Sequence, residues 1–372
     1  MAVTLLLHGK HAGPTVRYDP FGPWIVPWRF HSFEEEYRAL HTGAGLIDYS
    51  TQAVVECRGA DLVGFLQRIL TNDLTRLSPG TGCQAALLTP SGKLLADLLV
   101  LADPDALWLL CDLQCAPVVA KTLDKYRFSE QVTVIAHERR QAVLALQGPG
   151  AIELLTHLSG TVIELSRPGD HTGARVHEVP LRVIRHSLTG GFGVLCMVDA
   201  DRVDAVWNSL RREGSPHGLR LVGWEALNAA RIEAGLPWFG IDMDEANLLP
   251  ETGLEAVAVS DTKGCYIGQE IVARMQTYGS ANKKLMGLRV EGDEVAAGDR
   301  IVRKGEELGN VTSACRSPVL RCPIAMGYVK RGAYEPGTVV DILHGAARVR
   351  ATVTERPFVS SPGDTSIFPR WV

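Results

Sequence analysis

The chain has 372 residues, of which 46% are hydrophobic and 22% are charged, and its formal net charge is −4. This length and composition predict a soluble globular protein of two or three domains. The slightly acidic balance gives no support for a nucleic-acid or membrane-surface partner, because both favour basic patches. No apolar run approaches the roughly 20 residues that cross a bilayer, and the first ten residues lack the pattern of a signal peptide. We therefore expect a cytoplasmic protein.

The first two thirds of the chain predict alternating helices and strands. Ser32 followed by Glu35 is typical of a capping box, which opens a helix that ends near Gly43. Asp61 is expected to cap a second helix. Further elements follow in chain order: a hairpin of strands 84–89 and 94–101, a helix over 117–126, strands over 132–136 and 143–146, a helix ending near residue 158, a similar series to residue 210, and a helix over 222–235. Such alternation indicates mixed α/β layers.

After about Asn282 the pattern changes to short strand-like runs. The six runs cover residues 285–290, 299–303, 308–313, 325–329, 338–343 and 348–354, with glycines between them. Short strands separated by turn residues predict a small β-barrel of about 75–90 residues. We therefore expect two α/β subdomains over 22–281, one of them at about 52–140, and a barrel domain over 282–360.

The eight cysteines are scattered along the chain and include no Cys-x-x-Cys pair. This spacing argues against a disulfide framework, a structural zinc site and an iron–sulfur cluster held by this chain alone. The histidines show no metal-binding spacing either. We predict no metal site.

One segment, Lys-Gly-Cys-Tyr-Ile-Gly-Gln-Glu at 263–270, combines a thiol, an ammonium and a carboxylate with two glycines, and Arg274 follows closely. Glycines on both sides of Cys265 would allow a ligand to approach its sulfur. The positive charges of Lys263 and Arg274 would favour the reactive thiolate. The alternative is a glycine-rich turn with a half-buried cysteine, and the residues alone favour neither interpretation.

Two carboxylates occur among apolar or small residues. Asp97 lies in the predicted strand 94–101, whose other residues are apolar, so that a buried carboxylate there needs a partner or a ligand. Burial would raise its pKa toward the range that is useful near neutral pH. Glu233 shares a helix face with alanines. A ring with several N–H donors would suit both carboxylates. The structural alternatives are a bond from Asp97 to a backbone amide or an arginine, and an Arg231–Glu233 ion pair.

At these residues the sequence resembles those of the folate-binding superfamily that contains the aminomethyltransferase, or T-protein, of the glycine cleavage system. The octapeptide 263–270 is similar to that of the YgfZ-type iron–sulfur assembly factors. Further similar stretches run along nearly the whole chain: 24–50, 71–74, 92–100, 231–235, 250–251, 311–313, 317–318, 336–338 and 357–358. The resemblance implies an α+β fold, a ring of two α/β lobes plus a small C-terminal β-barrel, with tetrahydrofolate in a central channel.

The resemblance also implies roles for single residues. Asp97 matches the aspartate that contacts folate near N10 in aminomethyltransferases, and Glu233 matches the carboxylate that binds the pterin ring. The expected folate site is completed by Arg231, Lys263, Tyr266, Gln269 and Arg274, with Lys283 and Lys284 as alternatives to Arg274 for the glutamate tail.

Two departures from the aminomethyltransferases concern the amine-transfer site. The acidic residue of their glycine-rich segment is absent from residues 189–193. Cys111 or Asp112 stands where they have an asparagine.

Three hypotheses about function follow. In the first, which the octapeptide favours, a tetrahydrofolate-binding protein assists iron–sulfur cluster assembly or repair in client enzymes, with Cys265 as the functional thiol. In the second, an aminomethyltransferase moves a one-carbon unit from an aminomethyl-lipoyl carrier to tetrahydrofolate, and Asp97 orients N10. In the third, the chain is a folate-binding scaffold without chemistry. The expected partners are folate and either iron–sulfur client enzymes or a lipoylated carrier protein.

Overall fold

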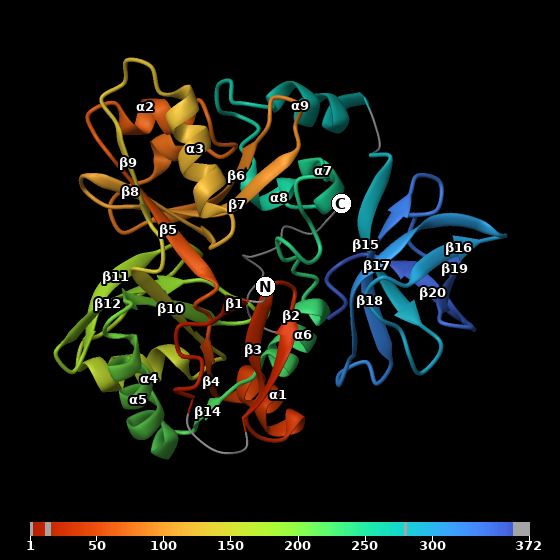
Figure 1. The fold of residues 1–372 in the computed structure, drawn as a ribbon, viewed down its shortest axis with the longest axis horizontal. Coiled ribbons are helices and arrows are strands. Elements are labelled where there is room, and N and C mark those ends of the chain that lie inside the picture. Colours follow the sequence, from red (N-terminus) through yellow and green to blue (C-terminus); the bar gives the residue numbers. More distant parts are fainter. Residues whose placement is uncertain (1–2, 12–15, 279–280, 360–372) are drawn as a thin grey trace.

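The computed structural model describes residues 3–11, 16–278 and 281–359. Two α/β lobes, a small N-terminal sheet and a C-terminal barrel make up the molecule, with the lobes on the left of Figure 1 and the barrel on the right. The predicted α+β fold is confirmed. Across the described ranges, every helix is too short or too polar to cross a bilayer.

A three-stranded sheet, which was not predicted, opens the chain. Its order is β1 (Val3–Thr4), β3 (Trp24–Arg29) and β2 (Arg17–Phe21), and helix α1 (Phe33–Thr42) follows. Ser32 accepts the predicted N-cap bond from the Glu35 amide at 3.3 Å. The buried Glu36 accepts hydrogen bonds from the backbone amides of Phe30 at 2.6 Å and Gly223 at 2.7 Å, which fixes α1 against the start of a later helix.

The first lobe contains a five-stranded sheet in the order β6-β7-β8-β5-β9. Its elements are β5 (Gln52–Arg58), α2 (Leu62–Gln67), the 3-10 helix η1 (Leu74–Arg76), β6 (Gly82–Leu88), β7 (Leu94–Ala102), β8 (Ala106–Asp112), α3 (Ala116–Tyr126) and β9 (Thr133–His137). One face of the sheet packs on α2 and α3. Asp61 does not cap α2 as expected, because its Oδ2 atom accepts the Gln131 amide at 2.7 Å instead.

The second lobe contains a six-stranded sheet in the order β11-β12-β13-β10-β4-β14. Its elements are β4 (Ala44–Asp48), β10 (Gln141–Gln147), α4 (Ala151–Ser159), β11 (His171–Val176), β12 (Val179–Arg185), β13 (Gly193–Asp199), α5 (Val203–Gly214), the 3-10 helix η2 (Ser215–His217) and β14 (Leu219–Leu221). Neighbouring strands β4 and β10 flank the first lobe in sequence, so that the first lobe is inserted into the second. The two sheets share one apolar core, to which Leu101 and Leu195 contribute.

Four helices connect the lobes to the barrel. They are α6 (Trp224–Glu233), α7 (Leu249–Thr252), α8 (Glu255–Ala258) and α9 (Gln269–Tyr278). Eight of the ten residues of α6 are buried, as expected for a helix that contacts β3 as well as the barrel strands.

The C-terminal barrel is closed in the strand order β15-β18-β17-β16-β19-β20. Its strands are β15 (Lys283–Val290), β16 (Arg300–Arg303), β17 (Glu306–Arg316), β18 (Pro323–Lys330), β19 (Val339–His344) and β20 (Ala347–Thr354). Apolar residues at alternating positions, such as Leu288 and Val290, fill the interior. The predicted six-stranded barrel is confirmed.

Candidate functional site

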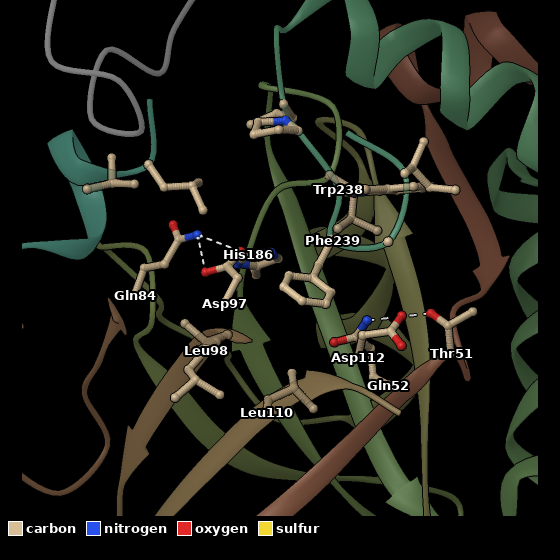
Figure 2. A pocket seen from close by; sticks show the side chains of 18 of the residues that line it. Thr51, Gln52, Gln84, Asp97, Leu98, Leu110, Asp112, His186, Trp238 and Phe239 are labelled. Carbon is tan, nitrogen blue, oxygen red and sulfur yellow. Dashed lines mark hydrogen bonds between the residues drawn. The ribbon is translucent and has the colours of Figure 1, made fainter. Parts of the chain in front are cut away.

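A cavity of about 470 Å³ lies where the two lobes, the N-terminal sheet and the segment around α7 meet (Figure 2). Its lining comes from residues far apart in the sequence, from Phe21 on β2 to Arg356 after β20. The polar and charged residues in the lining include Tyr49, Thr51, Gln52, Asn72, Gln84, Asp97, Asp112, Gln114, His186, Ser187, Thr252 and Arg356. This size and this mixture of apolar walls with a few polar groups are typical of a small-molecule site.

Asp97 lies on β7 directly opposite Ala86 of β6. The small alanine leaves room for Gln84, which is two residues along β6 and on the same face of the sheet. The Gln84 Nε2 atom donates to both carboxylate oxygens of Asp97, at 2.9 and 3.0 Å (Figure 2). The carboxylate is therefore held in one orientation at the cavity wall.

Burial shifts the pKa values of titratable residues in the cavity wall. Burial raises the pKa of the Asp97 carboxyl to about 6, and hydrogen bonds from Gln84 and the Leu98 amide limit the rise. A carboxyl with this pKa can hold or release a proton near neutral pH. Burial, assisted by the charge of Arg185, lowers the pKa of His186 in the same lining to about 4. The His186 imidazole is therefore neutral at pH 7.

A second carboxylate, Asp112, reaches the cavity from the end of β8. Strands β7 and β8 are antiparallel with Leu99 opposite Leu110, and Asp97 and Asp112 each lie two residues further toward the same end. Because side chains alternate along a strand, both carboxylates lie on the same face of the sheet. Figure 2 shows the ring of Phe239 between them.

Aromatic side chains line the part of the cavity next to Asp112. Burial raises the pKa of the Asp112 carboxyl to about 6, while hydrogen bonds from the Gln114 amide and the Trp24 side chain oppose this shift. Burial and the charge of Asp112 raise the pKa of Tyr49. Ring centroids in the adjoining cluster lie 5.4 Å apart for Phe21–Trp238, 5.2 Å for Trp224–Trp238 and 6.1 Å for Tyr49–Trp238. Such walls suit a planar ligand.

The chain after the barrel closes the cavity. Arg356 donates to the backbone carbonyls of Gly235 at 2.9 Å and Thr252 at 2.7 Å. Gly235 has a φ of +67°, and a Cβ at this position would lie 2.6 Å from the Cβ of Arg356. Glycine is therefore required where the two segments cross.

Arg231 and Glu233, at the end of α6, do not line the cavity, contrary to expectation. Both are buried. Their partners are Asp242 at 2.6 Å and Ser313 at 2.6 Å for Arg231, and the hydroxyls of Tyr37 and Ser317 for Glu233. The ion pair of Arg231 is thus with Asp242 and not with Glu233. Because these contacts join α6 to α1 and to the barrel, both side chains stabilise the fold.

Lys263 also has a structural environment. Its buried Nζ atom donates to the backbone carbonyls of Leu70 at 2.5 Å and Asn72 at 2.7 Å, and burial lowers its pKa to about 8. The ammonium therefore stabilises the segment after α2, rather than the thiolate of Cys265 as expected. Cys265 itself is exposed in the loop before α9 and is absent from the cavity lining.

The remaining candidates also lie outside the lining. Tyr266 is buried in an apolar cluster beneath β6, Gln269 is half-buried at the start of α9, and Arg274 is exposed on that helix. Lys283 lies over the ring of Tyr328 and Lys284 over that of Tyr334, at 4.7 and 4.9 Å. Of the site residues predicted from the sequence, the structure brings Asp97 to the cavity and leaves the others elsewhere. Asp112, which the sequence showed only as a departure from the asparagine of the aminomethyltransferases, also lines the cavity.

The glycine-rich segment 189–193 is shaped by a neighbouring strand. A Cβ at Gly193 would lie 2.2 Å from Oε1 of Gln147, which is fully buried and accepts the Leu188 amide at 2.8 Å. The space beside Gly193 is therefore filled by Gln147, and no side chain fits at that position.

Comparison with protein families decides the classification. Residues 7–262 match the model of the GCVT N-terminal domain, and residues 283–360 match that of the glycine cleavage T-protein C-terminal barrel domain. The chain belongs to the glycine cleavage T-protein family. The family models cover both lobes and the barrel.

Several relatives that match along nearly their whole length are named aminomethyltransferases. The aminomethyltransferase of Synechococcus sp. strain CC9311 is 30% identical over 92% of this chain and 94% of its own. The aminomethyltransferase of Symbiobacterium thermophilum is 31% identical over 96% of this chain and 97% of its own. The crystal structure of the glycine cleavage system aminomethyltransferase T from Bartonella henselae superposes with a TM-score of 0.86 at 24% identity, over 97% of this chain and 99% of that one. This last match shows the T-protein fold.

These relatives overturn the hypothesis of an iron–sulfur assembly factor. They match along nearly the whole chain and are named aminomethyltransferases. The octapeptide that suggested the assembly function lies apart from the cavity, with Lys263 engaged by backbone carbonyls. The T-protein family assignment holds, and the preference for the YgfZ-type factors, with iron–sulfur client enzymes as partners, was wrong.

Proposed function

We propose that this T-protein family member transfers a one-carbon unit from an aminomethyl group to tetrahydrofolate, as an aminomethyltransferase. The observation that carries the proposal is the cavity carboxylate Asp97, fixed by Gln84 and poised to exchange a proton near neutral pH. The full-length likeness to aminomethyltransferases supports the same activity.

The cavity fits tetrahydrofolate by size and chemistry. Its volume of about 470 Å³ is in the range of sites for ligands of this kind. The aromatic cluster around Trp238 offers faces for a planar ring. Two carboxylates accept hydrogen bonds from ring N–H groups, and Arg356 adds a positive charge to the lining.

In the proposed reaction the carbon of the aminomethyl group, at the formaldehyde oxidation level, forms bonds to the two amine nitrogens of bound tetrahydrofolate. Its bonds to the carrier sulfur and to the amino nitrogen break, and the carrier thiol and ammonia leave with the two amine protons, so that no oxidant or reductant is needed. Asp97 would accept a hydrogen bond from one of these amines and direct its lone pair toward the incoming carbon. Because burial raises the pKa of Asp97 to about 6, the carboxylate can also take up the amine proton during bond formation. Gln84 limits the carboxylate to one orientation, which is the positioning that such a step requires.

The proposed donor is the aminomethyl group on a lipoylated carrier protein. The names of the relatives support an aminomethyl donor. All eight cysteines are free, which supports the cytoplasmic location predicted from the sequence.

The test is a coupled assay with an aminomethyl-loaded lipoylated carrier and tetrahydrofolate. Asp97→Asn should lower kcat by about 10²–10⁴-fold, the range for general acid–base groups, while the Kd for tetrahydrofolate changes little. The matched control is Asp201→Asn, whose side chain is 79% exposed at the surface, and it should retain wild-type turnover.

Equal turnover of wild type and Asp97→Asn would refute the role of Asp97. Tight binding of tetrahydrofolate by the wild type without any turnover would refute the transferase and support the folate-binding scaffold.

A further inference from the structure

A histidine of the second lobe lines the same cavity as Asp97. His186 directly follows β12, and Leu188 and Leu195 of the same lobe line the cavity with it. Asp97 belongs to β7 of the first lobe, and Figure 2 shows both side chains in the lining. Because the cavity lies where the lobes meet, a ligand bound there meets a carboxylate from one lobe and an imidazole from the other.

Hydrogen bonds fix the backbone that carries this imidazole. The His186 amide donates to the carbonyl of Gly193 at 3.1 Å, and the His186 carbonyl accepts Nε2 of Gln147 at 3.3 Å. The fully buried Gln147 also accepts the Leu188 amide at 2.8 Å. One side chain therefore holds the chain on both sides of residue 187, and with it the place of His186 in the wall.

The imidazole itself makes no hydrogen bond within the part of the chain that the structure describes. A neutral imidazole has one donor nitrogen and one acceptor nitrogen, so that both remain for a ligand. The leucines beside it offer no polar partner. A polar ring in such a wall favours a ligand that supplies its missing hydrogen bonds.

The charge state of the ring decides what it offers. Burial and the charge of Arg185 lower the pKa of His186 to about 4, so that the ring is neutral at pH 7. A neutral ring has no charge with which to form an ion pair with Asp97. Its N–H therefore remains a donor for an atom of the ligand.

The direction of the proposed reaction gives this donor a target. When the carbon–sulfur bond of the aminomethyl carrier breaks, its electron pair goes to sulfur. In a displacement at carbon, the attacking and leaving atoms lie on opposite sides of that carbon. Asp97 of the first lobe positions the attacking amine, so that the departing sulfur lies toward the second lobe, which carries His186. A fixed donor in an apolar wall stabilises negative charge that develops beside it.

We propose that His186 is a catalytic residue that donates its N–H to the carrier sulfur while the carbon–sulfur bond breaks. The imidazole keeps its proton throughout. The proton of the first amine goes to Asp97 and from there to the departing ammonia, while that of the second amine goes to solvent, from which the thiolate takes its own. This inference rests on the proposed transferase function and adds a residue that assists the departure of sulfur.

The experiment compares a variant without a donor and a variant with one in the coupled carrier assay. His186→Leu should lower kcat by about 10²–10³-fold, the range for loss of one donor to developing negative charge, whereas His186→Gln, which keeps an N–H, should stay within about tenfold of wild type. The Kd for tetrahydrofolate, measured by calorimetry, should change by less than about threefold in both. The matched control is His157→Gln on the surface of α4, which should retain wild-type turnover.

A second carrier separates a role in bond breaking from a structural role. The same carrier protein is loaded with the aminomethyl group on an aromatic thiol in place of the lipoyl group, and an aromatic thiolate is a better leaving group. His186→Leu should lose about tenfold less turnover with this carrier than with the lipoyl carrier, because the sulfur then needs the donor less. Circular dichroism and denaturant titration establish that each variant is folded, and His186→Met supplies a second side chain without a donor.

Several outcomes would overturn the inference. Wild-type turnover of His186→Leu, or equal losses with the two carriers, would show that the ring does not assist the departure of sulfur. A loss of tetrahydrofolate affinity that accounts for the whole decrease in kcat/KM would show that His186 acts in binding instead. Each of these results leaves the transferase function intact, whereas wild-type protein without turnover of the lipoyl carrier refutes that function and this inference together.

Discussion

Replacing Asp97 by asparagine removes a buried negative charge while keeping the shape of the side chain, and the effect on stability should depend on pH. The pKa of this carboxyl is 3.8 in the unfolded chain and about 6 in the folded protein. Below pH 3.8 both states are protonated and the shift has no effect. Between pH 3.8 and about 6 the unfolded state has lost its proton while the folded state still holds it, so that the folded state becomes progressively less favoured as pH rises. Above about pH 6 both states are ionised and the destabilisation is constant.

The magnitude follows from the two pKa values. The difference between 3.8 and about 6 corresponds to a destabilisation of about 3 kcal/mol at pH 8 and about 1.5 kcal/mol at pH 5. Asparagine keeps one acceptor for Gln84 and loses the other, which offsets about 1 kcal/mol. We therefore expect Asp97→Asn to be more stable than wild type by about 2 kcal/mol at pH 8 and by about 0.5 kcal/mol at pH 5.

The assay is urea denaturation at both pH values, followed by tryptophan fluorescence and circular dichroism, with Asp201→Asn as the control. The informative quantity is the change in the stability difference between the two pH values, because Asp112 titrates in the same way in both proteins. A difference that does not depend on pH, or a variant that is less stable than wild type at pH 8, would show that burial does not govern the Asp97 pKa. The same variant should lose turnover, so that a gain in stability would accompany a loss of function.

The remaining predictions concern residues outside the cavity. Arg231→Met should lower the free energy of unfolding by about 3–5 kcal/mol, because it leaves the fully buried Asp242 without its positively charged partner. In denaturation experiments the double variant Arg231→Met/Asp242→Leu should recover most of this loss. No recovery would contradict a buried ion pair. Lys263→Met should lower it by about 2–4 kcal/mol, since two buried backbone carbonyls lose their donor; a variant as stable as wild type would show that these bonds contribute little. Cys265→Ser should leave turnover within about twofold and the free energy of unfolding within about 0.5 kcal/mol, because the thiol is exposed and away from the cavity. A large loss of turnover would show that the octapeptide 263–270 takes part in the reaction.

Local patterns in the sequence predicted the parts of the fold that depend on local order. The glycine-punctuated runs after residue 282 predicted the six barrel strands to within a few residues, because alternation and turns are encoded in neighbouring positions. The same kind of reasoning marked Asp97, since a carboxylate within a run of leucines stands out without knowledge of its partners.

The features of the site that depend on long-range contacts could not be predicted from the sequence. Asp112 ends an apolar strand, where an acidic residue is ordinary, and it is the register of β8 with β7 that places it on the same face of the sheet as Asp97. Arg231 and Glu233 looked like ligands because their partners lie on distant elements, among them Ser313 and Ser317 of the barrel region. Whether a conspicuous polar residue meets a ligand or another part of the chain depends on tertiary packing, which the local pattern does not contain.

The wide sequence span of the cavity bears on how the protein is made. The lining begins at Phe21 and is completed by Arg356, which crosses Gly235 after the last barrel strand. A chain emerging from the ribosome can therefore fold its first lobe early, yet its binding site stays unfinished until translation has passed residue 356. Contacts of such sequence separation form late in folding. Ligand binding is thereby confined to chains that have been synthesised through the barrel, and a translation product that stops earlier would bind no substrate.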